Sequence, residues 1–257
     1  MRSNLIKGGL GMRIRCLLAA AGILAACAPI NMPTPVRDPV VGESINIIFT
    51  SYNATYHISL SSVERPKKAS DRYGAQKIYY QPANKKYGSF FEDDLIKASW
   101  FVSSRSIAFL LQNKTDHSIK IPWDEAAFVD EIGLSHRVMH SGIKYSEREQ
   151  PQAPSVIVRK GTIEDIVFPT DYVHWRSGSR STGAKWEEQP FFPDLDIHGP
   201  SLGGKYLDFD LFKAATGKYV GKSIQILLPL QIENIINDYI FVFTIDSVST
   251  REESKTI

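Results

Sequence analysis

The chain has 257 residues, of which 43% are hydrophobic and 23% are charged, and its formal net charge is +2. This composition is typical of a soluble folded protein and argues against a chain that is disordered throughout. Four of the 30 basic residues lie within the first 15 positions, which contain no acidic residue, so the rest of the chain has 26 basic and 28 acidic side chains. A near-neutral body lacks the basic surplus of nucleic-acid-binding proteins, and we expect no nucleic-acid partner.

The first 26 residues have the pattern of a secretory signal peptide. A basic start up to Arg15 is followed by an apolar run from Cys16 to Leu24 and then by small residues. The apolar run is too short to span a bilayer, which takes about 20 residues. Translation could begin at Met1 or at Met12, because the residues that follow Met12 also supply a basic region.

The end of this leader, Leu24-Ala25-Ala26-Cys27, resembles the lipobox of bacterial lipoproteins. The resemblance covers the first 27 residues and implies that Cys27 carries lipid after cleavage before it. It also implies an envelope protein held at a membrane. Ala28 stands where an aspartate would favour inner-membrane retention, so the resemblance favours the outer membrane if the cell is Gram-negative. The alternative is an ordinary secretion signal that contains a cysteine.

The positions of the cysteines limit the kinds of site that the folded body can contain. The chain has only Cys16, within the leader, and Cys27. If Cys27 is lipidated, the body has no disulfide, no cysteine nucleophile and no zinc–thiolate site. Residues 27–42 contain four prolines and no apolar periodicity, which indicates a semi-rigid lipidated tether. We expect residues 43–257 to form the body.

The body is expected to consist mainly of β-strands. Short runs rich in β-branched and aromatic residues alternate with turn residues, and 207–216 is the best candidate helix. This pattern predicts an antiparallel β-sandwich. The predicted strands are 45–50, 55–60, 77–80, 99–102, 106–111, 118–121, 127–130, 136–140, 155–158, 163–168, 223–228 and 239–245.

Residues 105–169 also resemble immunoglobulin-like domains of bacterial lipoproteins whose role is largely unassigned. The resemblance rests on the turn at 113–116, the segment from Trp123 to Glu131, and Lys160-Gly161 ahead of a strand that ends at Pro169. It covers under half of the chain after the leader and implies an immunoglobulin-like sandwich, which the strands at 223–230 and 238–246 would close. Residues 170–222 have little periodicity and are expected to be a long irregular insertion that packs on the body and covers a sheet edge.

Two segments have some features of ligand sites. Residues 217–223 approach a phosphate-binding glycine loop, but Thr216 replaces the first glycine and the segment leads into a strand instead of a helix. His136 and His140 are weak candidates for a metal site. On a strand they share a face but stand ~13 Å apart, whereas on a helix they could chelate zinc. Surface or hydrogen-bonded histidines are the simpler interpretation.

The remaining candidates also have simpler structural interpretations. Asp194 with Asp196 and Asp208 with Asp210 could serve calcium or glycoside chemistry, but they lack calcium-loop spacing and are expected to be exposed acids. The four tryptophans could form a platform for sugars or peptides, or belong to the core; they are Trp100, Trp123, Trp175 and Trp186.

No intact catalytic motif is present, although a spatial Ser/His/Asp arrangement would leave no local signature. The sequence therefore favours a lipid-anchored, non-enzymatic binding or scaffolding module. Such a module would need no cofactor and would have an envelope protein as partner. The alternative is an envelope hydrolase whose carboxylate and histidine residues are brought together by the fold. For that alternative, His136, His140, His174 and an aspartate should meet in one deep pocket.

Overall fold

The computed structural model describes residues 47–65, 72–81, 88–179, 182–200 and 202–256. The predicted leader (1–26), Cys27 and the predicted tether (27–42) lie outside the described residues. The described residues belong to one compact unit, Ile45–Ile257. Among them, no helix is both long and apolar enough to cross a bilayer.

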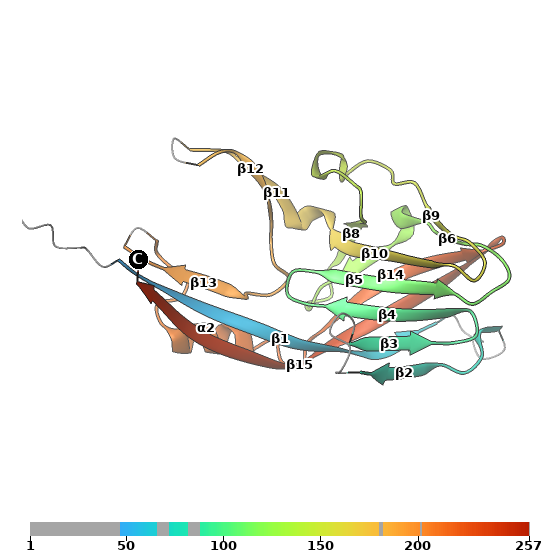
Figure 1. Ribbon diagram of the computed structural model, residues 1–257, viewed down its shortest axis with the longest axis horizontal. Coiled ribbons are helices and arrows are strands. Elements are labelled where there is room, and N and C mark those ends of the chain that lie inside the picture. The colour runs from blue at the N-terminus through green and yellow to red at the C-terminus, as the bar shows by residue number, and fades with distance from the viewer. Residues whose placement is uncertain (1–46, 66–71, 82–87, 180–181, 201, 257) are drawn as a thin grey trace, which may run out of the picture. The chain divides into compact units, whose positions relative to one another are not determined.

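The prediction of a mainly β, antiparallel, sandwich-like fold is confirmed (Figure 1). One layer contains, in spatial order, β13 (Leu195–His198), β1 (Ile48–Glu64), β15 (Ile235–Thr256), β14 (Ser223–Ile232) and β7 (Ala127–Val129). β14 also pairs with β6 (Ile119–Ile121), which in turn pairs with β9 (Ser155–Ile157). The other layer contains β10 (Thr162–Pro169), β5 (Ile107–Asn113), β4 (Ile96–Val102), β3 (Ser89–Glu92) and β2 (Lys77–Tyr80).

A short strand, β8 (Ser135–Met139), joins the two layers. It forms a hairpin with β7 and pairs with β10 only at Phe168 and Pro169. The described residues also form a separate two-stranded sheet of β11 (Val173–Arg176) and β12 (Lys185–Glu188). Their short helices include α2 (Phe209–Gly217), η1 (Trp123–Glu125), η2 (Tyr145–Glu147) and η3 (Thr170–Tyr172).

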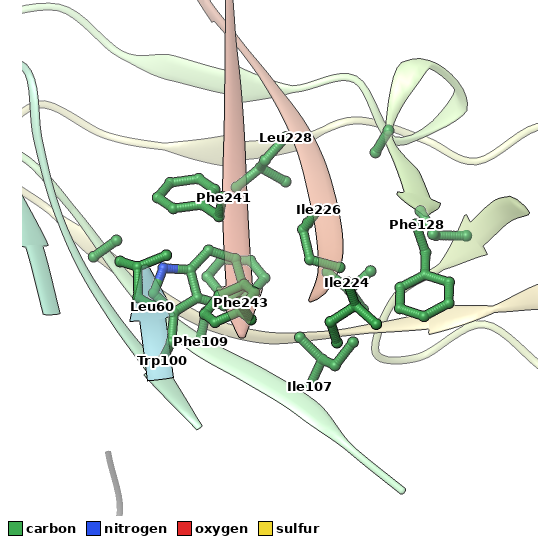
Figure 2. Close-up of a cluster of buried hydrophobic side chains, with 14 of the residues drawn as sticks. Leu60, Trp100, Ile107, Phe109, Phe128, Ile224, Ile226, Leu228, Phe241 and Phe243 are labelled. Carbon is green, nitrogen blue, oxygen red and sulfur yellow. The ribbon is translucent and has the colours of Figure 1, made fainter. Parts of the chain in front are cut away.

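Aromatic side chains from both layers form the centre of the core (Figure 2). The Trp100 ring on β4 lies 4.7 Å from Phe241 and 5.2 Å from Phe243, both on β15. Alternate residues of β5 and of the first half of β14 point inward, as expected for strands with one buried face. Each fully buried phenylalanine stabilises the fold by roughly 1.5–3 kcal/mol through the hydrophobic effect.

The first strand differs from its prediction. Two strands were expected at 45–50 and 55–60, but β1 runs without a break from Ile48 to Glu64. It pairs with β15 along almost its whole length, with register shifts after His57 and after Leu60. Between the two predicted runs, Ser51 and Asn53 alternate with the buried Tyr52 and Ala54 and remain in the strand, because β15 satisfies their backbone groups.

Residues 170–222 are not irregular throughout. They contain η3, β11, β12, β13 and α2. The expected covering of a sheet edge is present, since β13 pairs with β1 at Thr50 to Asn53. The helix predicted at 207–216 is α2. The carboxylate of Asp208 caps it by accepting from the Leu211 amide at 2.8 Å, and its buried Phe212 ring lies 5.8 Å from the ring of Tyr52.

A buried polar network joins the two layers near β3 and β15. The Asp93 carboxylate, which is fully buried, accepts from the amides of Leu95 and Ile96 at 2.9 Å. Its other oxygen accepts from the Arg65 guanidinium and from the Tyr239 hydroxyl, each at 3.0 Å. Burial, together with the Asp93 charge, raises the pKa of Tyr239, so this hydroxyl stays protonated and donates.

Candidate functional site

A cleft of about 540 Å³ lies beside β10 on the described surface. It lies between the start of β5, the β10 residues Ile166 to Phe168, and the loop 139–145 that follows β8. A second hollow of similar volume adjoins it and reaches along β12 to Lys185. The two hollows share Arg105, Tyr145 and Glu188, so the base of the β11–β12 hairpin forms a common wall.

The floor of the cleft is apolar and its rim is polar. Met139, Val167 and Phe168 are buried, whereas Ile166 is 39% exposed and available for contact. At the rim, Arg105 makes a bidentate pair with Asp194, with Nε–Oδ2 at 2.5 Å and Nη2–Oδ1 at 2.6 Å. This pairing raises the pKa of Arg105 and fixes the plane of its guanidinium.

Contacts from the 145–148 segment hold the hairpin wall in place. The Tyr145 hydroxyl donates to the Glu188 carboxylate, and this bond, together with burial, raises the pKa of Tyr145 to about 12. The Arg148 guanidinium lies 5.1 Å from the centre of the Trp186 ring, and its Nε donates to the Thr170 carbonyl at 3.1 Å. These polar and cation–π contacts attach the β11–β12 hairpin to the 145–148 segment. A two-stranded hairpin without such contacts would be only marginally stable.

His140 lines the cleft and is held by two contacts. Its Nδ1 lies 3.2 Å from Oδ2 of Asp165, and its ring stacks on the Trp123 indole at 4.4 Å with an interplanar angle of 3°. The other Asp165 oxygen accepts from the amides of Ser141 and Ile166 at 2.8 Å. With Nδ1 donating to Asp165, Nε2 is the nitrogen that can accept a proton.

His136 lies apart from the cleft, between two carboxylates. Its Nδ1 is 2.7 Å from Asp171 on η3, and its Nε2 is 3.3 Å from Asp130 in the β7–β8 turn. Burial opposes the charged form, but the two carboxylates outweigh it and raise the pKa of His136. The other Asp130 oxygen accepts from the Ile132 and Leu134 amides and shapes the turn. His136 therefore joins the β7–β8 turn to the segment that leads into β11.

A comparison with protein-family models, curated proteins and solved structures found no match. The site residues proposed from the sequence can therefore be compared only with the structure. His136 and His140 have different carboxylate partners, and the described residues contain no group of three or more His, Cys, Asp or Glu side chains placed to hold one metal ion. His174 lines the adjoining hollow and lies 3.7 Å from Glu187. The three histidines thus do not meet in one pocket.

The other candidates have visible structural roles. Asp194 binds Arg105, Asp196 accepts from the amides of Lys205 and Tyr206, Asp208 caps α2, and Asp210 is exposed. The glycine-containing segment 217–223 follows a helix and enters β14, which is opposite to a phosphate loop. Trp100 and Trp123 are core residues, Trp186 is half-buried and Trp175 is 54% exposed.

Sequence reasoning missed most of the cleft. Arg105, Tyr145, Asp165 and Glu188 lie far apart in the chain and carry no local motif. Their convergence depends on the pairing of β10 with both β5 and β8, and on the contacts of Tyr145 with Glu188 and Trp186 of β12. Among the residues that line the cleft, only His140 was a candidate from the sequence, as a weak metal ligand and as part of the alternative hydrolase site.

Proposed function

We propose that this chain is a lipid-anchored protein of the cell envelope whose body is a non-enzymatic binding module. The cleft beside β10 is its ligand site. The observation that carries this proposal is the union of an apolar floor with a fixed polar rim, the combination typical of small-ligand sites. The anchor is supported by the Leu24-Ala25-Ala26-Cys27 segment, and the outer membrane is favoured by Ala28.

The chemistry of the cleft favours an amphipathic ligand. Ile166 and Phe168 offer an apolar surface, while Arg105 and the paired Tyr145 and Glu188 offer charged and hydrogen-bonding groups at the edge. A ligand with an apolar portion and a polar or anionic end would satisfy both. Such an end could belong to a small molecule or to a side chain of an envelope protein partner.

A fluorescent probe with the same chemistry tests the site. Anilinonaphthalene sulfonate has apolar rings and one anionic group, and it should bind the purified protein saturably at one site. Replacing Ile166 by Trp fills the floor and should weaken binding by at least about ten-fold, which corresponds to ~1.4 kcal/mol. Ile78→Trp on β2 is the matched control, because Ile78 is similarly exposed, at 36%.

The probe experiment has two outcomes that would contradict the proposal. One is the absence of saturable binding to the natural sequence. The other is an equal loss for Ile166→Trp and Ile78→Trp, which would indicate nonspecific adsorption. Circular dichroism of both variants establishes that the fold is retained, so that a loss of probe binding reflects the cleft.

A hydrolase is the second candidate, and the Asp165–His140 pair at the cleft favours it. Asp165 orients the imidazole, as a third group does for catalytic histidines. In this mechanism, Nε2 of His140 takes a proton from water, the resulting hydroxide oxygen bonds to an ester carbonyl carbon, and the carbon–oxygen bond to the leaving group breaks. The imidazolium then returns the proton to the leaving alkoxide.

An ester assay decides between the two candidates. If the hydrolase is correct, p-nitrophenyl acetate should be cleaved faster than in buffer, and His140→Gln and Asp165→Asn should each reduce the rate by roughly 100-fold or more. His174→Gln, outside the main cleft, should leave the rate unchanged. A rate equal to buffer, or unaffected by His140→Gln, excludes the hydrolase and leaves the binding module.

A further inference from the structure

The turn between β7 and β8 is a rigid projection with two exposed apolar side chains. The Oδ1 atom of Asp130 accepts from the Ile132 and Leu134 amides at 3.0 and 2.8 Å, and the Asp130 amide donates to the Leu134 carbonyl at 3.0 Å. Gly133 has a φ of +90°, a backbone conformation that favours glycine. The turn therefore holds Ile132, which is 78% exposed, and Leu134, which is 56% exposed, in one conformation.

A second exposed turn, residues 217–222, lies beside the first. β14 is antiparallel to β7 and begins at the end of the pair where β7 finishes, so the two turns emerge together. Burial, followed by the charge of Glu131, raises the pKa of Tyr219, as expected if the two turns are neighbours. Val220 in the second turn is 48% exposed, so three apolar side chains are exposed at this end of the strand pair.

The two turns together have no net charge. Asp130 and Glu131 in the first are balanced by Lys218 and Lys222 in the second. The Lys218 ammonium lies 5.1 Å from the centre of the Tyr219 ring, and Lys222 is exposed. Lysine stems can lie along an apolar surface while their charged ends stay in water. Contact made by these turns would thus depend on apolar side chains and would not select a charged surface.

We propose that the β7–β8 turn inserts Ile132 and Leu134 into the interface of a lipid bilayer. A bilayer accepts a narrow projection without a matching pocket, whereas a stable protein partner needs roughly 800 Å² on each side. Burial of each side chain is worth ~1.5–3 kcal/mol, which orients a protein that is already tethered but does not hold a free one. The choice of a bilayer rests on the lipid at Cys27, which belongs to the proposed function.

The distance from the turns to the start of β1 is compatible with such an anchor. The Gly221 amide donates to the Ile245 carbonyl at 2.9 Å, and Ile245 lies opposite Ile58 on β1. Ile58 is ten positions from the first residue of β1, or ~33 Å along the strand. The 19 residues between Cys27 and Ile47 can span at most ~65 Å, so the anchor can reach the bilayer that the turns contact.

A tethered vesicle assay tests the proposal without lipidation. A form that begins at Ala28 retains the described core, whose first buried residue is Tyr52, and an added N-terminal hexahistidine binds it to phosphatidylcholine vesicles with a nickel-chelating lipid. Ser135→Cys, the only cysteine in this form, carries an NBD fluorophore beside the turn. On tethering, its emission should shift to the blue and be quenched by nitroxide-labelled lipid, and added salt should not reverse this. Combining Ile132→Ser with Leu134→Ser should lower the ratio of inserted to free turn by at least about ten-fold.

Matched controls lie at the far end of β14, where β6 pairs with it. The double substitution Val156→Ser and Val158→Ser removes apolar side chains that are 54% and 62% exposed, and it should leave the quenching unchanged. A fluorophore on Asp116→Cys, at an exposed position in the turn before β6, should stay unquenched. Circular dichroism establishes that each variant keeps its fold.

Three results would overturn the insertion proposal. One is the absence of quenching for the tethered natural turn, and another is equal quenching with and without Ile132 and Leu134. The third is a blue shift that grows with protein concentration in the absence of vesicles, which would assign the turn to a second copy of the chain. Because neither lipidation nor the cleft enters this assay, its failure leaves the proposed function intact, and a failure to label Cys27 with fatty acid would not change its result.

Discussion

Removing the carboxylate of Asp93 should cost more stability than any other single change to a polar group described above. Asp93→Ala leaves the Arg65 guanidinium, whose side chain is only 9% exposed, without its counter-ion. It also deprives the Tyr239 hydroxyl and two amides of their acceptor. Breaking a buried ion pair from one side costs about 3–5 kcal/mol, so we expect about 4 kcal/mol, or roughly a thousand-fold change in the folding equilibrium.

Urea unfolding followed by circular dichroism measures this cost. Asp93→Asn loses the charge and the acceptor for Arg65 and Tyr239, but it keeps one acceptor oxygen for the two amides and should therefore cost less than Asp93→Ala. Arg65→Met in the Asp93→Ala background should recover part of the loss, because no unpaired buried cation remains. A cost below about 1 kcal/mol for Asp93→Ala, or strict additivity in the double variant, would refute the idea that this network couples the two layers.

Three further predictions concern charge, the anchor and redox state. Because His136 has a raised pKa, its stabilising contribution is complete below the ordinary value of about 6.5 and is lost as pH rises through the raised value. The urea concentration at the unfolding midpoint should therefore fall as the pH is raised above about 6.5, and His136→Gln should flatten this decline; equal slopes would contradict it. Cys27→Ser should abolish labelling by a fatty-acid analogue and release the protein from the membrane fraction or leave an uncut precursor, whereas wild-type fractionation without any lipid in the mass spectrum would disprove the anchor. The form from Ala28 onward, which has no cysteine, should have the same Tm with and without reductant, and a clear shift would show that a thiol was overlooked.

Local sequence patterns were sufficient to predict most strands of the sandwich. Alternating buried residues made β5 and the first half of β14 predictable, because each buries one face against the other layer, whereas β10 was predicted from its run of β-branched and aromatic residues. β3 was missed, as three of its four residues are buried and no alternation remains. β11, β12 and β13 were missed because their residues are largely exposed and gain their strand structure from pairing, which no local pattern encodes.

The candidate site was much less predictable than the fold. His136 and His140 differ by four positions, and their spacing drew attention, but each is oriented by a carboxylate on another element. Asp165 lies within a strand pattern as an ordinary polar residue, and only the β8–β10 junction brings it to His140. Side-chain convergence of this kind depends on tertiary packing, so it has no sequence signature.

The pairing of β1 with β15 also constrains when the protein can fold. Ile48 lies opposite Thr256, so β1 pairs with a segment that follows it at a very large distance in the sequence. Pairings this distant in sequence slow folding, because a long loop must close before the contacts form. A chain emerging amino end first therefore lacks the partner of β1 until β15 has been made. Truncation of β15 should accordingly leave β1 unpaired and block folding.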